Sequence, residues 1–88
     1  MKLKYIFEAM DMGEEIIAVP VGESASKVHG VLKLNKEGQE ILDLLKTDTT
    51  EDQIVSTLAA KYDNDRNQLA GYVHSVIAAL RNANLLEE

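Results

Sequence analysis

The stretch Leu34-Asn35-Lys36-Glu37-Gly38 marks the point at which the composition of the 88-residue chain changes. Before Asn35, three short segments rich in Ile, Val, Tyr and Phe are separated by turn residues. After Asn35, three amphipathic segments follow, and each begins with a residue suited to start a helix. The sequence therefore predicts one α+β domain over residues 1–88, in which a three-stranded antiparallel sheet precedes three helices (βββααα).

The segments before Asn35 have the alternation of half-buried strands. The predicted strands are Leu3–Met10, Glu15–Val21 and Lys27–Leu34, joined by a hairpin turn at residues 11–14 and a loop at residues 22–26. Pro20 has no N–H for a ladder hydrogen bond, so we expect it near the end of its strand or with its nitrogen facing outward. Gly30, in the third predicted strand, leaves room for a bulge or for another backbone.

The segments after Asn35 have helix start signals and apolar residues at helical spacing. The predicted N-terminal caps are Asn35, Thr50 with Gln53 three residues later, and Asp65 with Gln68. The first helix ends near Lys46, the second before Asp63, and the third spans Arg66–Ala83. The apolar residues of the third helix span roughly 140°, more than one contact with a core needs, so this helix has apolar surface left for a second neighbour. Asn84 is expected to take the left-handed conformation after the helix, and Leu85-Leu86 to fold back onto the core.

Composition and charge exclude several classes of protein. The chain has no cysteine, which excludes disulfides, thiolate zinc sites and a cysteine nucleophile. A chain of this length hides only about 60 to 65% of its unfolded surface, which leaves no room for a deep catalytic pocket. No apolar run approaches the roughly 18 residues of a membrane span, and Glu8 interrupts the opening segment before it could act as a signal peptide. We therefore expect a cytoplasmic protein that does not bind membranes.

The charge is distributed unevenly along the chain. The net charge is −6, yet residues 27–36 and 66–86 contain no acid and hold five of the nine Lys and Arg residues and both histidines. One interpretation is that buried segments simply carry few charges. The other is that the two acid-free windows adjoin in space and face an acidic partner.

The polar side chains form no recognisable catalytic or metal site. His29 and His74 have no second ligand three or four residues away, so neither predicts a metal site. The paired acids occur at turns and in first turns of helices, where negative charge complements the helix dipole. No serine lies in a nucleophile motif, and there is no glycine-rich phosphate loop. The sequence therefore predicts a protein that is not an enzyme and that holds no metal or cofactor.

Two short helices followed by a longer one, attached to a sheet, are typical of a winged helix-turn-helix domain, a class that usually binds DNA. The third helix would be the recognition helix, but it offers only Arg66 and Arg81, about four turns apart. Neutralising the six to ten phosphates of a typical site takes more cations than this helix and an acidic chain supply. We expect no nucleic-acid binding, and DNA binding stays the weaker alternative.

The chain resembles the PqqD family. The resemblance rests on Leu34-Asn35-Lys36-Glu37-Gly38, on Thr50 with Ile54-Val55 in the second helix, on Tyr62-Asp63 at its close, and on Asn84-Leu85-Leu86 after the last helix, where the family usually has a glycine before the leucines. These are mostly capping and core residues, so they identify a fold and family rather than a substrate.

The resemblance implies a peptide-recognition domain for ribosomally made, post-translationally modified peptides. In such proteins the leader segment of a precursor peptide adds as a strand to the edge of the third strand, beside the third helix, and is presented to a modifying enzyme, often a radical SAM protein. Carried onto this chain, the peptide-binding residues are Lys27, Val28, His29, Gly30, Val31, Leu32, Lys33, Leu69, Tyr72, Val73 and Val76.

These residues lie in the same two acid-free windows, and strand addition suits them physically. Backbone hydrogen bonds provide affinity, and alternate side chains of the added strand fill apolar pockets. Lys27 and Lys33 would protect the edge in the free protein and attract an acidic leader. The structural alternative is a homodimer in which that strand edge pairs with itself.

Overall fold

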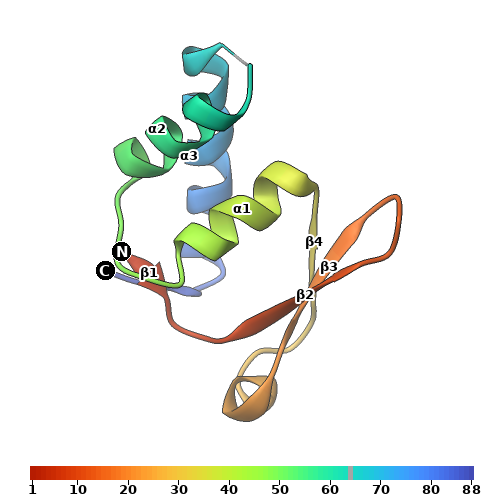
Figure 1. Cartoon of the computed structure of the whole chain (residues 1–88). Helices are drawn as coiled ribbons and strands as arrows, with labels where there is room; N and C mark the ends of the chain where they lie inside the picture. The colour runs from red at the N-terminus through yellow and green to blue at the C-terminus, as the bar shows by residue number, and fades with distance from the viewer. Residues whose placement is uncertain (64) are drawn as a thin grey trace.

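The computed structural model describes residues 1–63 and 65–88 (Figure 1). Its strands are β1 (Lys2–Leu3), β2 (Phe7–Asp11), β3 (Ile16–Pro20), β4 (Leu32–Leu34) and β5 (Leu86–Glu87), and its helices are a short 3₁₀-helix η1 (Gly22–Ser26), α1 (Lys36–Leu44), α2 (Glu51–Lys61) and α3 (Arg66–Asn82). β2, β3 and β4 form an antiparallel sheet in that order, and the three α-helices follow it along the chain. The predicted fold class is confirmed.

Side-chain caps start the three α-helices where the sequence predicts. Asn35 Oδ1 accepts a hydrogen bond from the Gly38 N–H (2.8 Å), and the Thr50 hydroxyl accepts one from the Gln53 N–H (3.2 Å). Asp65 also caps α3, but its carboxylate accepts from Asn67 (2.7 Å), one residue earlier than the expected Gln68. Each cap satisfies an N–H that has no partner within its helix.

The end of α3 forms the expected left-handed cap. Asn84 has a φ of 61°. The Asn84 N–H donates to the Arg81 carbonyl and the Leu85 N–H to the Leu80 carbonyl, both at 3.0 Å. This is the Schellman arrangement, and it turns the chain so that Leu85 and Leu86, which are 5% and 6% exposed, pack into the core.

A tight hairpin joins β2 to β3. The Met12 N–H donates to the Glu15 carbonyl (2.9 Å), and Gly13 takes a φ of +95° in the turn. At the other end of the hairpin, the Val21 N–H donates to the Ile6 carbonyl (3.0 Å). In an antiparallel pair the residues that exchange hydrogen bonds alternate with residues whose backbone groups point away. These two bonds therefore show which residues of β2 and β3 point their backbone N–H and C=O toward the other strand of the hairpin and which point them away from it.

The third predicted strand, Lys27–Leu34, was too long: only Leu32–Leu34 forms β4. By the alternation along β3, Ile16, Ala18 and Pro20 point their backbone nitrogens toward β4. The register pairs Ala18 with Leu32, so Gly30 would lie opposite Pro20, which has no N–H to donate. Gly30 has a φ of +109°, outside the strand region. The ladder therefore ends at Leu32, and residues 27–31 are not part of it.

The first predicted strand, Leu3–Met10, is interrupted. Leu3 belongs to β1, which pairs with β5 at the C-terminal end, and β2 begins only at Phe7. Between them the Lys4 N–H donates to the Leu85 carbonyl (2.8 Å), and the Ile6 N–H donates to the buried Ser24 hydroxyl (2.9 Å). These bonds hold residues 4–6 in a path that leads from the β1–β5 sheet to the β2–β3–β4 sheet. The segment 22–26, predicted as a loop, forms η1 and supplies Ser24.

The core lies between the helices and one face of the sheet. Phe7 and Ala18 project from the sheet into a cluster formed by α1, α2, α3 and the C-terminal Leu85-Leu86. In Figure 1 the three α-helices gather on one side of the β2–β3–β4 sheet, and the two chain ends lie next to each other. The largest side chains with less than 2% exposure are Ile41, Leu45, Ile54, Leu58, Val73 and Ile77. Burying these side chains is the main source of stability for so small a domain.

Candidate functional site

The free edge of β4 carries unpaired backbone groups. β4 is the last strand of the β2–β3–β4 sheet, and within residues 1–63 and 65–88 it pairs only with β3. Leu32 and Leu34 point their backbone groups toward β3, so the N–H and C=O of Lys33 point away from the sheet. Such an edge accepts another strand readily.

A hollow of about 220 Å³ separates this edge from α3. Its walls come from β4, from the α1 cap Asn35 and the α1 residue Leu42, from one side of α3 and from Leu85, and its lining is mostly apolar. The residues that line it are Leu32, Lys33, Leu34, Asn35, Leu42, Tyr72, Val76, Ala79, Leu80, Ala83 and Leu85. Tyr72, Val76, Ala79 and Ala83 are spaced by three or four residues, so they form one stripe along α3.

A second hollow of about 360 Å³ adjoins the first and follows the chain that precedes β4. The two hollows share Leu32, Ala83 and Leu85. The other residues that line the second are Tyr5, Phe7, Lys27, Val28, His29, Gly30, Val31 and Asn84. Together the two hollows form a groove, which we call the β4–α3 groove, along residues 27–35 on one side and the C-terminal half of α3 on the other.

The structure brings most of the residues expected for peptide binding to this groove. Lys27, Val28, His29, Gly30, Val31, Leu32 and Lys33 line it from one side, and Tyr72 and Val76 from the other. Leu69 and Val73 do not line it, because they are only 3% and 0% exposed and lie in the core.

Sequence reasoning missed the alanines that form the α3 wall of the groove. Ala79 and Ala83 follow Tyr72 and Val76 at helical spacing, which is the signal that could have identified them. An alanine adds little to an apolar stripe, and here its small side chain leaves the hollow open. Leu69 and Val73 carry a stronger apolar signal because they belong to the core.

Tyr72 ties α3 to the start of α1 at one end of the groove. Its hydroxyl donates to Asn35 Oδ1 (2.7 Å), the same oxygen that caps α1. A Cβ atom at Gly38 would lie 3.2 to 3.3 Å from Asn35 Oδ1, a Leu34 methyl group and the Tyr72 hydroxyl, so the glycine makes room for this contact. Burial raises the pKa of Tyr72 above its usual value, while the hydrogen bond to Asn35 opposes this. Tyr72 is therefore a neutral hydrogen-bond donor at neutral pH.

The charge around the groove is positive. The side chains of Lys27, His29, Lys33 and Lys36 are exposed, and all belong to the first acid-free window. Arg81, in the second window, is engaged by Glu88 through hydrogen bonds of 2.7 and 3.0 Å, and this pairing raises the arginine pKa. Because residues of both windows line the same hollow, the two windows adjoin in space. Lys27, Lys33 and Lys36 take part in none of the ion pairs found among the described residues, and they lie on the strand side of the groove.

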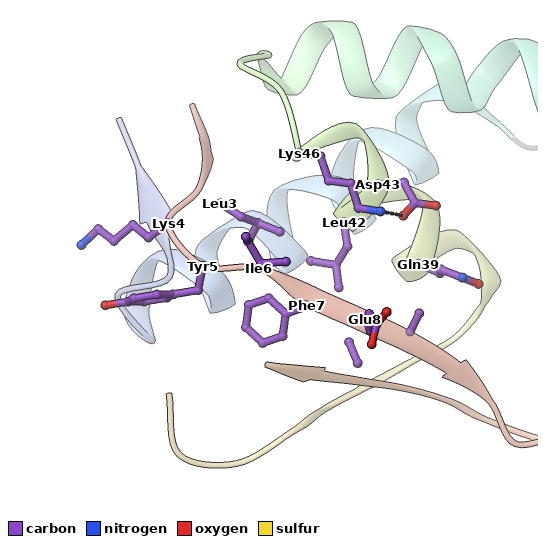
Figure 2. A pocket seen from close by; sticks show the side chains of 12 residues that line it. Leu3, Lys4, Tyr5, Ile6, Phe7, Glu8, Gln39, Leu42, Asp43 and Lys46 are labelled. Atoms are coloured by element: carbon purple, nitrogen blue, oxygen red, sulfur yellow. Dashed lines mark ion pairs between the residues drawn. The ribbon is translucent and has the colours of Figure 1, made fainter. Parts of the chain in front are cut away.

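A third hollow of about 570 Å³ lies at the other edge of the sheet, between the segment that leads into β2 and α1 (Figure 2). Leu3, Ile6, Phe7, Ala9 and Leu42 provide its apolar lining. Figure 2 shows Lys46 and Asp43 at its rim, where they form an ion pair of 3.3 Å. No pattern in the sequence indicates this hollow, because its walls come from segments that lie far apart along the chain.

The polar side chains that could suggest chemistry are dispersed. Within residues 1–63 and 65–88, no three His, Cys, Asp or Glu side chains are grouped so that they could hold a metal ion. His74 Nδ1 lies 3.3 Å from Glu51 Oε2, between α3 and α2, and both groups are partly exposed. Over the same residues, none of the helices has both the length and the apolar character needed to cross a membrane.

Comparisons with known proteins agree with this geometry. The solved structure of TbiB1 in complex with the TbiA(beta) leader peptide has the same fold, with a TM-score of 0.70 and 23% sequence identity over 99% of this chain and 95% of that chain. No curated protein matches the chain significantly. A family model described as coenzyme PQQ synthesis protein D (PqqD) matches residues 12–86. The matched residues cover both the sheet and the helices, and the chain belongs to the PqqD family.

Proposed function

We propose that this protein is a non-catalytic peptide-binding adaptor. It captures the leader segment of a precursor peptide by adding it as a strand to β4, and it presents the rest of the precursor to a modifying enzyme such as a radical SAM protein. The observation that carries the proposal is the free β4 edge, which lies beside a mostly apolar groove against α3. An extended peptide needs both features: backbone partners along one side and pockets for alternate side chains.

The likeness to TbiB1, whose structure contains a leader peptide, supports this choice of ligand, as does membership of the PqqD family. The site supports it independently. A guest strand on β4 would bond to the outward N–H and C=O of Lys33, and its inward side chains would enter the hollow between Leu34 and Val76. Leu69 and Val73 are left out of this site because they are buried.

The charge of the groove indicates the kind of leader it binds. The exposed Lys27 and Lys33 flank the strand side, and residues 27–36 contain no acid. A leader with acidic side chains on its outward-facing positions would lie close to both lysines, whereas a basic leader would be repelled. Because exposed ion pairs are screened by salt, the charge contribution should be largest at low ionic strength.

The test uses a synthetic peptide with the sequence of the cognate precursor's leader segment, with affinity measured by calorimetry. Lys33→Pro removes an N–H that points away from β3, so the sheet keeps its own hydrogen bonds while the guest loses one. We expect at least about a tenfold loss of affinity, since one backbone hydrogen bond contributes about 0.5–1.5 kcal/mol and the proline ring also obstructs the edge. Lys33→Ala is the matched control, because it removes the charge but keeps the N–H.

Lys33→Glu separates the electrostatic part of the interaction from the backbone part. It should weaken an acidic leader by about 0.5–1 kcal/mol, mostly at low salt. Amide shifts on titration should change along residues 27–34 and along the Tyr72–Ala83 side of α3, and remain nearly constant in α2 and the turn at residues 11–14. Equal affinity for Lys33→Pro and Lys33→Ala, or a shift map centred on α2, would show that the leader binds elsewhere.

A further inference from the structure

The sheet has a second free edge, on β2, at the opposite end from β4. Ile6 and Met12 mark the two ends of the β2–β3 hairpin, because their backbone groups bond to Val21 and Glu15. The residues between them alternate, so Phe7, Ala9 and Asp11 point their N–H and C=O away from β3. Among the described residues, no other strand pairs with this side of β2.

This edge is unusually apolar for an unpaired one. Large exposed hydrophobic side chains occur at four positions in the described part of the chain, and three of them are Ile6 (69% exposed), Met10 (47%) and Met12 (61%). These three share one face of β2 with Glu8, since they are an even number of residues apart. Proteins usually protect a free edge with charge or proline, but here only Glu8 and Asp11 do so.

We propose that β2 pairs with β2 of a second copy of this chain, in antiparallel orientation around a twofold axis at Ala9. The outward N–H and C=O of Ala9 would bond to the C=O and N–H of Ala9 in the second copy. The twofold axis has to lie at a residue whose backbone groups point outward, because only such residues form hydrogen-bonded pairs across the new strand contact. The two three-stranded sheets would join into one sheet of six strands. This inference is independent of the peptide-binding function, and it uses a different edge from the homodimer considered from the sequence.

The sequence of β2 is self-complementary in this register. Pairing around Ala9 places Ile6 opposite Met12 of the second copy and Glu8 opposite Met10. All three exposed apolar side chains thus gain a cross-strand neighbour, and no two like charges lie directly opposite each other. A register centred on Asp11 would leave Ile6 without a partner and place Glu8 opposite Glu14. Charge and apolar pairing therefore both favour the register at Ala9 over the register at Asp11.

The hollow beside α1 fits the same arrangement. It runs along the free side of β2, and Phe7 and Ala9 line it together with Gln39 and Leu42 of α1. Figure 2 shows Phe7 on the β2 side of this hollow and Gln39 and Leu42 on the α1 side. A strand added to β2 would bring alternate side chains into this space, as a guest strand on β4 would fill the groove beside α3. Because the two edges are at opposite ends of the sheet, a β2 dimer leaves both β4–α3 grooves open.

Sedimentation velocity of the full chain, from micromolar to submillimolar concentration, tests the proposal. We expect a concentration-dependent dimer. Ala9→Pro removes an N–H that β3 does not use, and should give a monomer, whereas Lys33→Pro makes the same substitution on the other edge and should leave the dimer intact. A wild-type monomer at every concentration overturns the inference. A dimer that survives Ala9→Pro also overturns it, and loss of the dimer in Lys33→Pro alone would assign pairing to β4.

Substitutions of Met10 test the register without disturbing the backbone. Met10→Lys places a cation opposite Glu8 of the second copy twice per dimer, so the dissociation constant should fall several-fold at low salt. Met10→Glu places a second carboxylate opposite Glu8 of the second copy and should raise the dissociation constant. Both changes remove the same methionine, so a general loss of packing would raise the dissociation constant of both variants. That result would overturn the Ala9 register. This test does not depend on whether Ala9→Pro folds.

Discussion

At the scale of single residues, Asn35 performs two tasks with one oxygen. Its Oδ1 accepts from the Gly38 N–H and from the Tyr72 hydroxyl, at 2.8 and 2.7 Å. The first bond starts α1, and the second attaches α3 to the junction of β4 and α1. A Cβ atom at Gly38 would lie 3.2 to 3.3 Å from groups at this junction, so these groups would have to move by a few tenths of an ångström to accept a side chain. The Leu34-Asn35-x-x-Gly38 pattern therefore holds the two walls of the β4–α3 groove together at one end.

This arrangement predicts an energetic coupling between Gly38 and Tyr72. Tyr72→Phe should lower the free energy of unfolding by about 0.5–1.5 kcal/mol, the contribution of one hydrogen bond. Gly38→Ala should destabilise the wild-type chain, and less so in the Tyr72→Phe background, because the Tyr72 oxygen is one of the atoms the new methyl group would meet. Urea denaturation of the four proteins gives the coupling energy.

Gly71→Ala is the control for this double-mutant cycle. Gly71 lies inside α3, and nothing is within 4 Å of a Cβ built there. Replacing it with alanine should stabilise the chain by about 0.5–1 kcal/mol through helix propensity alone. If Gly38→Ala stabilises the chain as much as Gly71→Ala does, then Gly38 has no steric role and the Asn35–Tyr72 junction tolerates a side chain.

At the scale of elements, the pairing of β4 with α3 decides whether the protein has a groove. A β-strand edge next to a helix lined with large side chains would be closed, because those side chains would reach the strand. The side chains of Ala79 and Ala83 are too short to fill the space between α3 and β4, so the hollow stays open on this side. Val76 and Leu80 supply its apolar surface. The third helix therefore has two roles: Leu69, Val73 and Ile77 hold it in the core, and the alanine-containing stripe faces the groove.

Filling the groove should block peptide binding without harming the fold. Ala79 is exposed, so Ala79→Leu adds three carbon atoms to a hollow of about 220 Å³ and should lower leader affinity at least about tenfold, while the unfolding free energy changes by less than about 1 kcal/mol. Ala70→Leu places the same side chain at an exposed position near the start of α3, outside the groove lining, and should leave affinity unchanged. Fluorescence-anisotropy titration with labelled leader measures both. Full affinity in Ala79→Leu would remove this stripe from the peptide site.

At the scale of the whole molecule, charge and topology separate the two free edges. The β4 edge lies in a region with exposed lysines and no acid, whereas residues 5–26, which include β2 and β3, carry five acids and no Lys or Arg. The described acids of this segment take part in no ion pair found in residues 1–63 and 65–88. The two ends of the sheet thus carry opposite charge and suit different partners.

The same charge distribution predicts that the chain does not bind duplex DNA, although its helices follow a winged-helix order. Arg81 is paired with Glu88, and Arg66 donates to the Ser56 hydroxyl (3.1 Å), so the cations of α3 are partly engaged. With a net charge of −6, phosphate contacts cannot provide the usual non-specific affinity. Anisotropy with a labelled duplex at physiological salt should give no saturable binding, and submicromolar affinity with a steep salt dependence would contradict this.

Much of this fold was determined by the sequence alone, because helix caps, turns and apolar periodicity act between residues close together in the chain. Asn35, Thr50 and Asp65 start their helices as predicted, and Asn84 ends α3 in the left-handed conformation. Membership of the PqqD family follows from these same local patterns together with the core residues. The predicted residues Tyr72 and Val76 also line the groove for a local reason, since helix periodicity sets their faces.

Only the tertiary structure decided how long the edge strands are and which side of α3 stays open. β4 is short because the register places Gly30 opposite Pro20, and the first strand is divided because Lys4 and Ile6 bond to Leu85 and Ser24. Leu69 and Val73 have the apolar character of a binding stripe, yet packing against the rest of the core buries them. Register, burial and the gap beside β4 depend on contacts between residues far apart in the chain, and a linear pattern of side chains does not contain that information.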